Sequence, residues 1–181
     1  GVQMPTKGDL ITMNLETAAT EAGDLTNTYR VLSTNGFTAD VVAMFDVNAN
    51  AQKYWDTNQT ITANSTTVTK YEGSTLDTAL NQSWYNALTP AAQNAIKASS
   101  IKQYGYSRNT SETNTPYVNY SSKVEVATLT NRYIYALDVE DVVNYFGTTF
   151  TAAQISTLFW NKTTADSTHP LLRSGSRNDT T

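Results

Sequence analysis

Residues 74–88, STLDTALNQSWYNAL, directly followed by residues 89–99, TPAAQNAIKAS, decide the fold class. Four large apolar residues of the first stretch recur at intervals of four, which places them on one face of a helix: Leu76, Leu80, Trp84 and Leu88. Ser74 or Thr75 stands where an N-cap is expected, because Ser and Thr side chains accept a hydrogen bond from the first helical turn. We therefore predict a helix over 74–88 that buries Leu76, Leu80 and Trp84, with Trp84 as a structural residue.

The second stretch repeats this start signal. Thr89 is the expected N-cap, and Pro90 follows at the first helical position, where its missing N–H costs nothing. Two helices joined by a short turn and packed on a sheet are the simplest arrangement of residues 74–99.

Strand patterns precede these helices. DLITMNL (9–15) interleaves apolar and polar residues, and TYRVLST (28–34) runs into Asn35-Gly36, a dipeptide that accepts positive φ in tight hairpin turns. FTADVVAMFDV (37–47) is rich in β-branched and aromatic residues and predicts the returning strand. Residues 48–70 are polar and irregular, and they predict a long surface loop.

Further elements follow the helices. Residues 103–122 read as a loop, RYIYALD (132–138) as a short buried strand, and DVEDVVNYFG (138–147) as a helix with Asp138 near its start and Gly147 at its stop. Residues 148–160 predict a further short helix. Strands, a helical pair, then one more strand and helix predict an α+β fold of antiparallel strands and two to four short helices, in a single domain over 1–181.

The composition limits the possible partners. The 181 residues carry a net charge of −4, from 12 Lys and Arg against 16 Asp and Glu, so no basic field is available for nucleic acid. Charged residues are only 15% of the chain, and threonines outnumber them, as suits a virion or extracellular surface protein. No apolar run approaches the ~18 residues of a membrane span, so we expect no membrane insertion.

The search for catalytic chemistry gives few candidates. Cysteine is absent, which excludes disulfides and thiolate sites, and His169 is the only imidazole, so a two-histidine metal site is excluded. His169 is either a surface loop residue or the base of a triad. Asp138 and Asp141, with Glu140 between them, are either a carboxylate site or acidic residues favoured by the helix dipole. We expect no enzyme activity, no metal and no cofactor.

Tyrosines gather in one polar segment with Asn and Ser: Tyr104, Tyr106, Tyr117 and Tyr120. Such a mixture is typical of adaptable recognition loops, because tyrosine offers a rigid ring with a hydrogen-bonding tip. The alternative is a loop fixed by a few half-buried tyrosines. Tyr104, Tyr106 and Tyr117 are taken as candidate ligand contacts.

Five segments in order resemble a bacterial and phage family of domains of unknown function that has a Trp-Trp-Leu-Arg-Ser hallmark. They are KGDLITMNL (7–15), TYRVLSTNG (28–36), residues 71–101, RYIYALDVEDVVNYFG (132–147) and HPLLRSGS (169–176). The resemblance covers about residues 7–176. Leu171-Leu172-Arg173-Ser174 departs from the hallmark by lacking the tryptophans, and the family's final strands are absent from this chain.

This family resembles C-type-lectin-like folds, which formylglycine-generating enzymes share with the variable proteins of diversity-generating retroelements. The resemblance implies that the end of the chain leads into a ligand-facing region, with Arg173 and Ser174 as structural residues and Ser176, Arg177 and Asn178 as contacts. From the residues alone, the basic, polar segment 169–181 is open to three interpretations: a frayed tail, a catalytic loop, or part of a binding surface.

These observations predict a non-enzymatic recognition module, on a phage tail or appendage or on a bacterial surface, that binds a host-surface glycan or protein. The alternative is a structural domain of a virion or surface assembly without a ligand of its own. Partners in that case are other virion or surface proteins, or further copies of the chain in a homo-oligomer.

Overall fold

The computed structural model describes residues 4–13, 27–44, 59–108, 118–147, 150, 154 and 175–176. The chain divides into two compact units, one formed by residues 1–52 with 152–167 and the other by residues 53–151 with 168–181. Each unit is described by itself, and the single domain stays a prediction. Antiparallel strands and few short helices make up the described residues, so the α+β class is confirmed.

The first unit contains an antiparallel sheet of three strands: β1 (Leu10–Thr12), β2 (Thr28–Thr34) and β3 (Ala39–Ala43). The hairpin predicted at Asn35-Gly36 is confirmed, since Gly36 has a φ of 91°, in the region that favours glycine. Asn35 Oδ1 accepts hydrogen bonds from the backbone N–H of Phe37 and of Thr38, at 2.9 and 2.8 Å. The side chain therefore holds the turn in shape.

The surface loop predicted over 48–70 is wrong for its second half. β4 (Thr60–Ala63) and β5 (Thr66–Thr69) form an antiparallel hairpin. Asn64 and Ser65 make its turn with φ values of 47° and 63°, the left-handed pair that a tight two-residue hairpin needs. The prediction missed the hairpin because Ser65 stands where glycine usually gives the signal.

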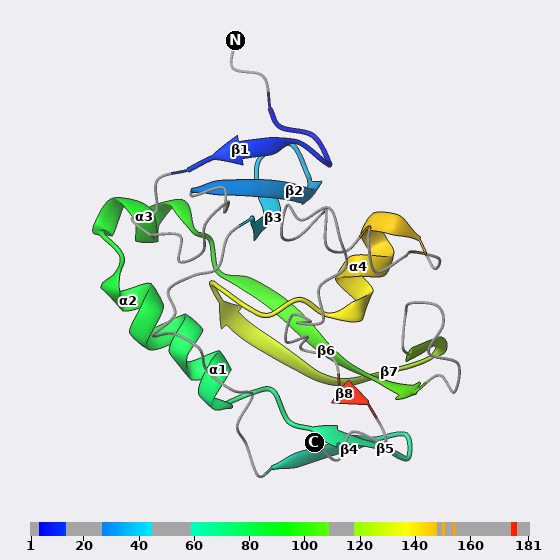
Figure 1. The fold of residues 1–181 in the computed structure, drawn as a ribbon. Coiled ribbons are helices and arrows are strands. Elements are labelled where there is room, and N and C mark those ends of the chain that lie inside the picture. Colours follow the sequence, from blue (N-terminus) through cyan, green and yellow to red (C-terminus); the bar gives the residue numbers. More distant parts are fainter. Residues whose placement is uncertain are drawn as a thin grey trace. The chain divides into compact units, whose positions relative to one another are not determined.

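The predicted helical pair is confirmed at its start signals. A continuous helical segment runs through α1 (Thr75–Thr78), η2 (Ala79–Trp84) and α2 (Tyr85–Ala87), and α3 (Pro90–Ala95) follows (Figure 1). Ser74 Oγ accepts a hydrogen bond from Asp77 N at 3.2 Å. Thr89 Oγ1 accepts one from Ala92 N at 3.3 Å, with Pro90 at the first helical position. Such a cap contributes about 1 kcal/mol.

The prediction that this helical segment buries Leu76, Leu80 and Trp84 needs correction. Leu88 is buried, whereas Leu76, Leu80 and Trp84 are only half-buried. Residues 79–84 form π-helical turns, so the α-helical spacing used for the prediction does not hold along this part. Of the three residues, Leu76 packs against the buried residues Tyr71, Ile101 and Leu129.

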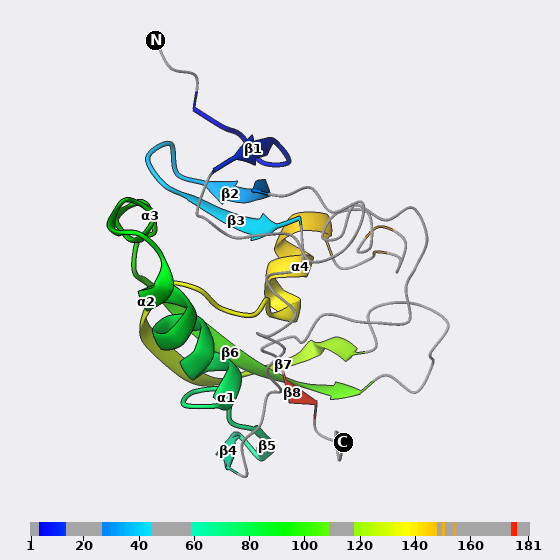
Figure 2. The ribbon, with the colours of Figure 1, turned by 60° about the vertical axis from the view of Figure 1, so that its left-hand side comes forward.

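Two long strands occupy the described parts of 103–122, so the loop predicted there is wrong for these parts, and residues 109–117 lie outside the described residues. β6 (Ser99–Arg108) and β7 (Val118–Arg132) pair antiparallel, with three register shifts along their length. β8 (Gly175–Ser176) pairs with β6 in parallel on the other side, as Figure 2 shows. The short strand predicted over 132–138 is also wrong, because β7 ends at Arg132 and the chain bends after it.

The core of the second unit lies where these elements meet. Tyr71, Ile101 and Leu129 are buried together, with Leu76 of α1 packed against them. On the same face of β6, Gly105 leaves room for the hairpin β4–β5, since an added Cβ would lie 2.9 Å from Thr66 Cγ2.

The helix predicted over 138–147 is confirmed as α4 (Val139–Phe146). Asp138 caps it and forms a reciprocal capping box with Asp141, and Gly147 ends it with a φ of 90°. The short helix predicted over 148–160 lies outside the described residues, apart from Phe150 and Gln154.

Candidate functional site

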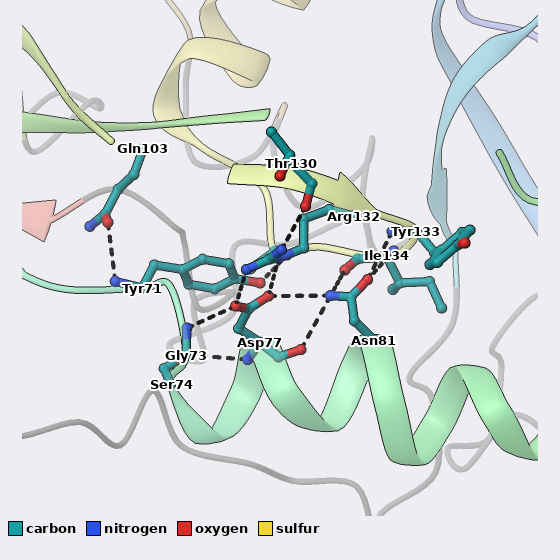
Figure 3. A network of polar contacts seen from close by, with 11 residues as sticks. Tyr71, Gly73, Ser74, Asp77, Asn81, Gln103, Thr130, Arg132, Tyr133 and Ile134 are labelled. Carbon is teal, nitrogen blue, oxygen red and sulfur yellow. Dashed lines mark hydrogen bonds and ion pairs between the residues drawn. The ribbon is translucent and has the colours of Figure 1, made fainter. Parts of the chain in front are cut away.

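Two networks of charged and polar side chains lie in the second unit. The first joins α1 and η2 to the end of β7 (Figure 3). Arg132 donates to both carboxylate oxygens of Asp77, from Nε and Nη2, each at 2.8 Å. The Asp77 side chain is 4% exposed and that of Arg132 18%. The hydrogen bond that Arg132 donates to the Asp77 carboxylate is the first cause that raises the pKa of Arg132. Arg132 Nη1 also donates to Thr130 O at 2.7 Å.

Other polar groups complete this first network. Asn81 Nδ2 donates to Asp77 Oδ1 and to Ile134 O, while its Oδ1 accepts from the backbone N–H of Tyr133 and Ile134. Gly73 N donates to Asp77 Oδ2 at 2.9 Å. All these partners belong to the protein itself, so this network holds α1 and the chain after β7 in place.

The second network lies between β6, β7 and the start of α4, and Asp138 is at its base. Asp138 has no exposed surface. Its carboxylate accepts from Tyr106 Oη at 3.0 Å, from Tyr104 N at 3.3 Å and from Glu140 N at 2.8 Å. Asp138 is therefore occupied in joining α4 to β6.

Above this base lies a half-exposed cluster, here called the tyrosine–lysine cluster: Tyr104, Tyr120, Lys123 and Glu140. Lys123 Nζ donates to Glu140 Oε2 at 2.9 Å and to Tyr120 Oη at 3.3 Å. The same ammonium lies 5.0 Å from the ring centroid of Tyr104 and 5.1 Å from that of Tyr120, within the range of cation–π attraction. Tyr120 Oη donates to Glu140 Oε2.

The pKa values of three groups in this network are raised, which favours their protonated forms. The hydrogen bond to Glu140, followed by burial, raises the pKa of Tyr120 above its ordinary value. The hydrogen bond with Glu140 likewise raises the pKa of Lys123. Burial, then the charge of Asp138, raises the pKa of Tyr106. At neutral pH the cluster thus contains a neutral phenol and a charged ammonium.

The tyrosine–lysine cluster keeps hydrogen-bonding capacity for another molecule. An ammonium has three N–H donors, and within the described residues Lys123 uses two of them. Glu140 accepts both of its hydrogen bonds at Oε2, and no described residue donates to Oε1. The side chains of Lys123 and Glu140 are 30% and 20% exposed. A donor and an acceptor thus lie side by side next to two aromatic rings.

The structure brings some of the predicted contact residues together. Tyr104 is half-buried within the cluster, and Ser176 of β8 pairs in register with Tyr106 of β6. Tyr106 itself, predicted as a ligand contact, has no exposed surface, and its hydroxyl donates to Asp138 Oδ1. This burial argues against a direct contact, and the role of Tyr106 stays a prediction. The remaining predicted site residues lie outside the described residues: Tyr117, Arg173, Ser174, Arg177 and Asn178.

The sequence analysis missed Lys123, and it considered Glu140 only together with Asp138 and Asp141, as part of a carboxylate site or as an acidic residue favoured by the helix dipole. The available signal was the alternation of Tyr120 and polar residues along 118–125, which indicates a strand and not a loop. Asp138 and Asp141 form the capping box of α4, and this local role explains both residues without a carboxylate site.

The described ranges contain no group of three or more His, Cys, Asp or Glu side chains that is arranged to hold a metal ion. No helix in the part of the chain that the structure describes is long and apolar enough to cross a membrane.

The fold and the two networks define a mixed α+β protein whose longest strand pair supports a half-exposed aromatic and charged cluster. Residues 38–177 match the family described as Domain of unknown function (DUF6273), and the chain belongs to this family. The match begins later than the resemblance predicted at residue 7 and includes every residue of the tyrosine–lysine cluster. No curated protein matches the chain, and no solved structure matches it.

Proposed function

We propose that the protein is a non-enzymatic recognition module, carried on a phage appendage or a bacterial surface, that binds a host-surface glycan or protein. One observation carries this proposal. In the tyrosine–lysine cluster, an N–H of Lys123 and the Oε1 of Glu140 that no described residue engages lie beside two half-exposed tyrosine rings. Few, well-placed polar groups beside aromatic surface are what small-ligand sites use for orientation and affinity.

The proton affinities in the cluster support recognition over acid–base chemistry. A tyrosine that acts as a base at neutral pH needs a lowered pKa, whereas the pKa of Tyr120 is raised, first by its hydrogen bond to Glu140. The pKa of Lys123 is raised as well, which keeps it a cation and not a nucleophilic amine. Both groups are therefore suited to holding a ligand by hydrogen bonds.

The C-type-lectin-like architecture belongs to this proposal as its finer part. The order of the five sequence segments supports it, together with a mixed α+β chain of antiparallel sheets and few helices. In this reading the β6–β8 pairing brings the segment at Ser176 to the sheet that holds the cluster.

Binding of the purified protein to an array of bacterial-surface and animal-surface glycans and proteins tests the proposal. We expect binding to a defined set of array members, and a loss of about fivefold or more in Tyr120→Ala, because each stacked ring contributes on the order of 1 kcal/mol or more. Lys97→Met, which changes the net charge at the exposed end of α3, is the control and should bind normally. Tyr120→Ala that folds and binds unchanged would exclude the cluster as the site.

The alternative function, assembly within a virion or surface structure, is favoured by a different observation. Phe37 is 91% exposed at the tip of the β2–β3 hairpin, which Asn35 holds in shape. A rigid, exposed aromatic residue is typical of an anchor in a protein interface. Sedimentation of the protein and of Phe37→Ser over a range of concentrations tests this function. Self-association that the substitution abolishes, without any binding on the array, supports assembly, and a monomer in both cases contradicts it.

A further inference from the structure

The charge balance of the tyrosine–lysine cluster limits the class of ligand, a step that rests on the proposed function. Lys123 is neutralised by Glu140 at 2.9 Å. Asp138 lies directly below, with its carboxylate accepting from Glu140 N. Lys123 and Glu140, the one cation and the one carboxylate of the cluster, are thus paired with each other, and the whole chain carries a net charge of −4. An anionic ligand would find no unpaired cation within the cluster.

The hydrogen-bonding groups that remain also select the ligand. Lys123 offers one donor and Glu140 Oε1 one acceptor, and both belong to the same ion pair. Two adjacent hydroxyl groups match them, since one hydroxyl accepts from the ammonium while its neighbour donates to the carboxylate. Hydrogen bonds to charged partners are the stronger ones, so a diol is held firmly without any charge of its own.

The rings supply the third requirement. Tyr104 and Tyr120 both lie within about 5 Å of the ammonium, at 5.0 and 5.1 Å from Nζ to the ring centroids. A group that reaches the free N–H therefore lies next to ring surface. The C–H face of a pyranose is apolar and adjoins its hydroxyls, so one sugar ring can contact a tyrosine and the ion pair together.

We infer that the tyrosine–lysine cluster is a subsite for a neutral pyranose with adjacent free hydroxyls, and that it discriminates against uronic and other acidic sugars. Glu140 is the specificity-determining residue, because its carboxylate both accepts from the diol and repels an anion. Lys123 is the donor, and Tyr104 and Tyr120 form the apolar wall.

Competition with simple sugars tests this inference on the purified protein. Binding to its best array glycan is measured against methyl mannoside, methyl galactoside and methyl glucoside, each paired with galacturonate or glucuronate. We expect at least one neutral glycoside to compete at least about tenfold better than either uronate, with little dependence on salt because no net charge is neutralised.

Glu140→Gln gives the decisive comparison. Glu140 N, and not the side chain, donates to Asp138, so the cap of α4 remains in this variant. Removal of the carboxylate leaves Lys123 unpaired, and the preference should shift toward the uronates by about tenfold or more. Lys97→Met should keep the wild-type preference.

The outcomes separate the two proposals. Competition by uronates alone, or an unchanged preference in a folded Glu140→Gln variant, overturns the neutral-sugar inference while recognition at the cluster stands. Binding to array proteins but to no glycan also overturns the inference alone. No binding to any array member removes the proposed function and the inference together.

Discussion

Removal of the Arg132 side chain is the most direct test of the network in Figure 3. Arg132→Met keeps the length and apolar stem of the side chain and leaves the Asp77 carboxylate, 4% exposed, without its cation. Gly73 N and Asn81 Nδ2 remain as donors to that carboxylate. Breaking one partner of a buried ion pair costs about 3–5 kcal/mol, because an uncompensated charge stays in a poorly solvated place.

The exposed pair Lys102–Glu125 is the matched control. Its N–O distance is 3.1 Å, close to that of the buried pair, but its side chains are 49% and 44% exposed. Surface pairs of this kind contribute about 0–1 kcal/mol, so Lys102→Met should change stability little. Urea unfolding followed by circular dichroism measures both substitutions in one set of conditions.

A double variant separates charge burial from lost packing. Asp77→Asn removes the charge but keeps an oxygen that accepts from Gly73 N. In Arg132→Met with Asp77→Asn no buried charge remains, so part of the loss, on the order of 1–3 kcal/mol, should be recovered. If Arg132→Met costs no more than Lys102→Met, the Asp77–Arg132 pair does not hold α1 to β7, and the structural reading of this network is wrong.

Three further predictions concern β6 and α4. Because the pKa of Tyr106 is raised in the folded protein, the contribution of its neutral phenol to the free energy of unfolding is fully present below about pH 10 and is lost as the pH rises further. Urea unfolding at increasing pH should therefore show a smaller loss of stability in Tyr106→Phe than in the wild type. Equal losses in the two proteins would contradict this. Gly105→Ala places a Cβ 2.9 Å from Thr66 Cγ2 and 3.0 Å from Val68 Cγ1, so it should lower stability by about 1–3 kcal/mol; Thr66→Ser should restore part of this in thermal melts. Asp138→Ala should cost more than the ~1 kcal/mol of an ordinary cap, since Tyr106 Oη and Tyr104 N also lose their acceptor; a melt shifted by only a degree or two would argue against this.

Signals that lie within a few residues were read correctly from the sequence. Ser74, Thr89 and Asp138 cap the helices where their side chains predicted, and Gly147 ends α4. Each cap depends on a side chain and a backbone group three or fewer positions away, and the end of α4 depends on the φ of 90° that Gly147 adopts. The Asn35-Gly36 turn is of the same kind. Such features need no knowledge of the rest of the fold.

The strand β6 was not predicted because two of its buried positions are not apolar. Gln103 has no exposed surface, yet its amide is satisfied by Thr69 O and Tyr71 N. Gly105 faces the same side and leaves space for Thr66. A polar residue and a glycine at these positions conceal the alternation that marks a strand. Only the three-dimensional partners, some 30 residues away in sequence, explain them.

The first turn of α4 shows how far a local rule reaches and where it ends. The helix dipole accounts for acidic residues at 138, 140 and 141 as a group, but their side chains serve different purposes. Asp138 and Asp141 form the capping box, whereas Glu140 pairs with Lys123 of β7, 17 residues earlier. The capping box fixes the helix start, and the helix start fixes where Glu140 meets the strand. The cluster thus depends on a local signal that is legible in the sequence and on a strand partner that is not. The proposed specificity of the site resides in that second, long-range contact.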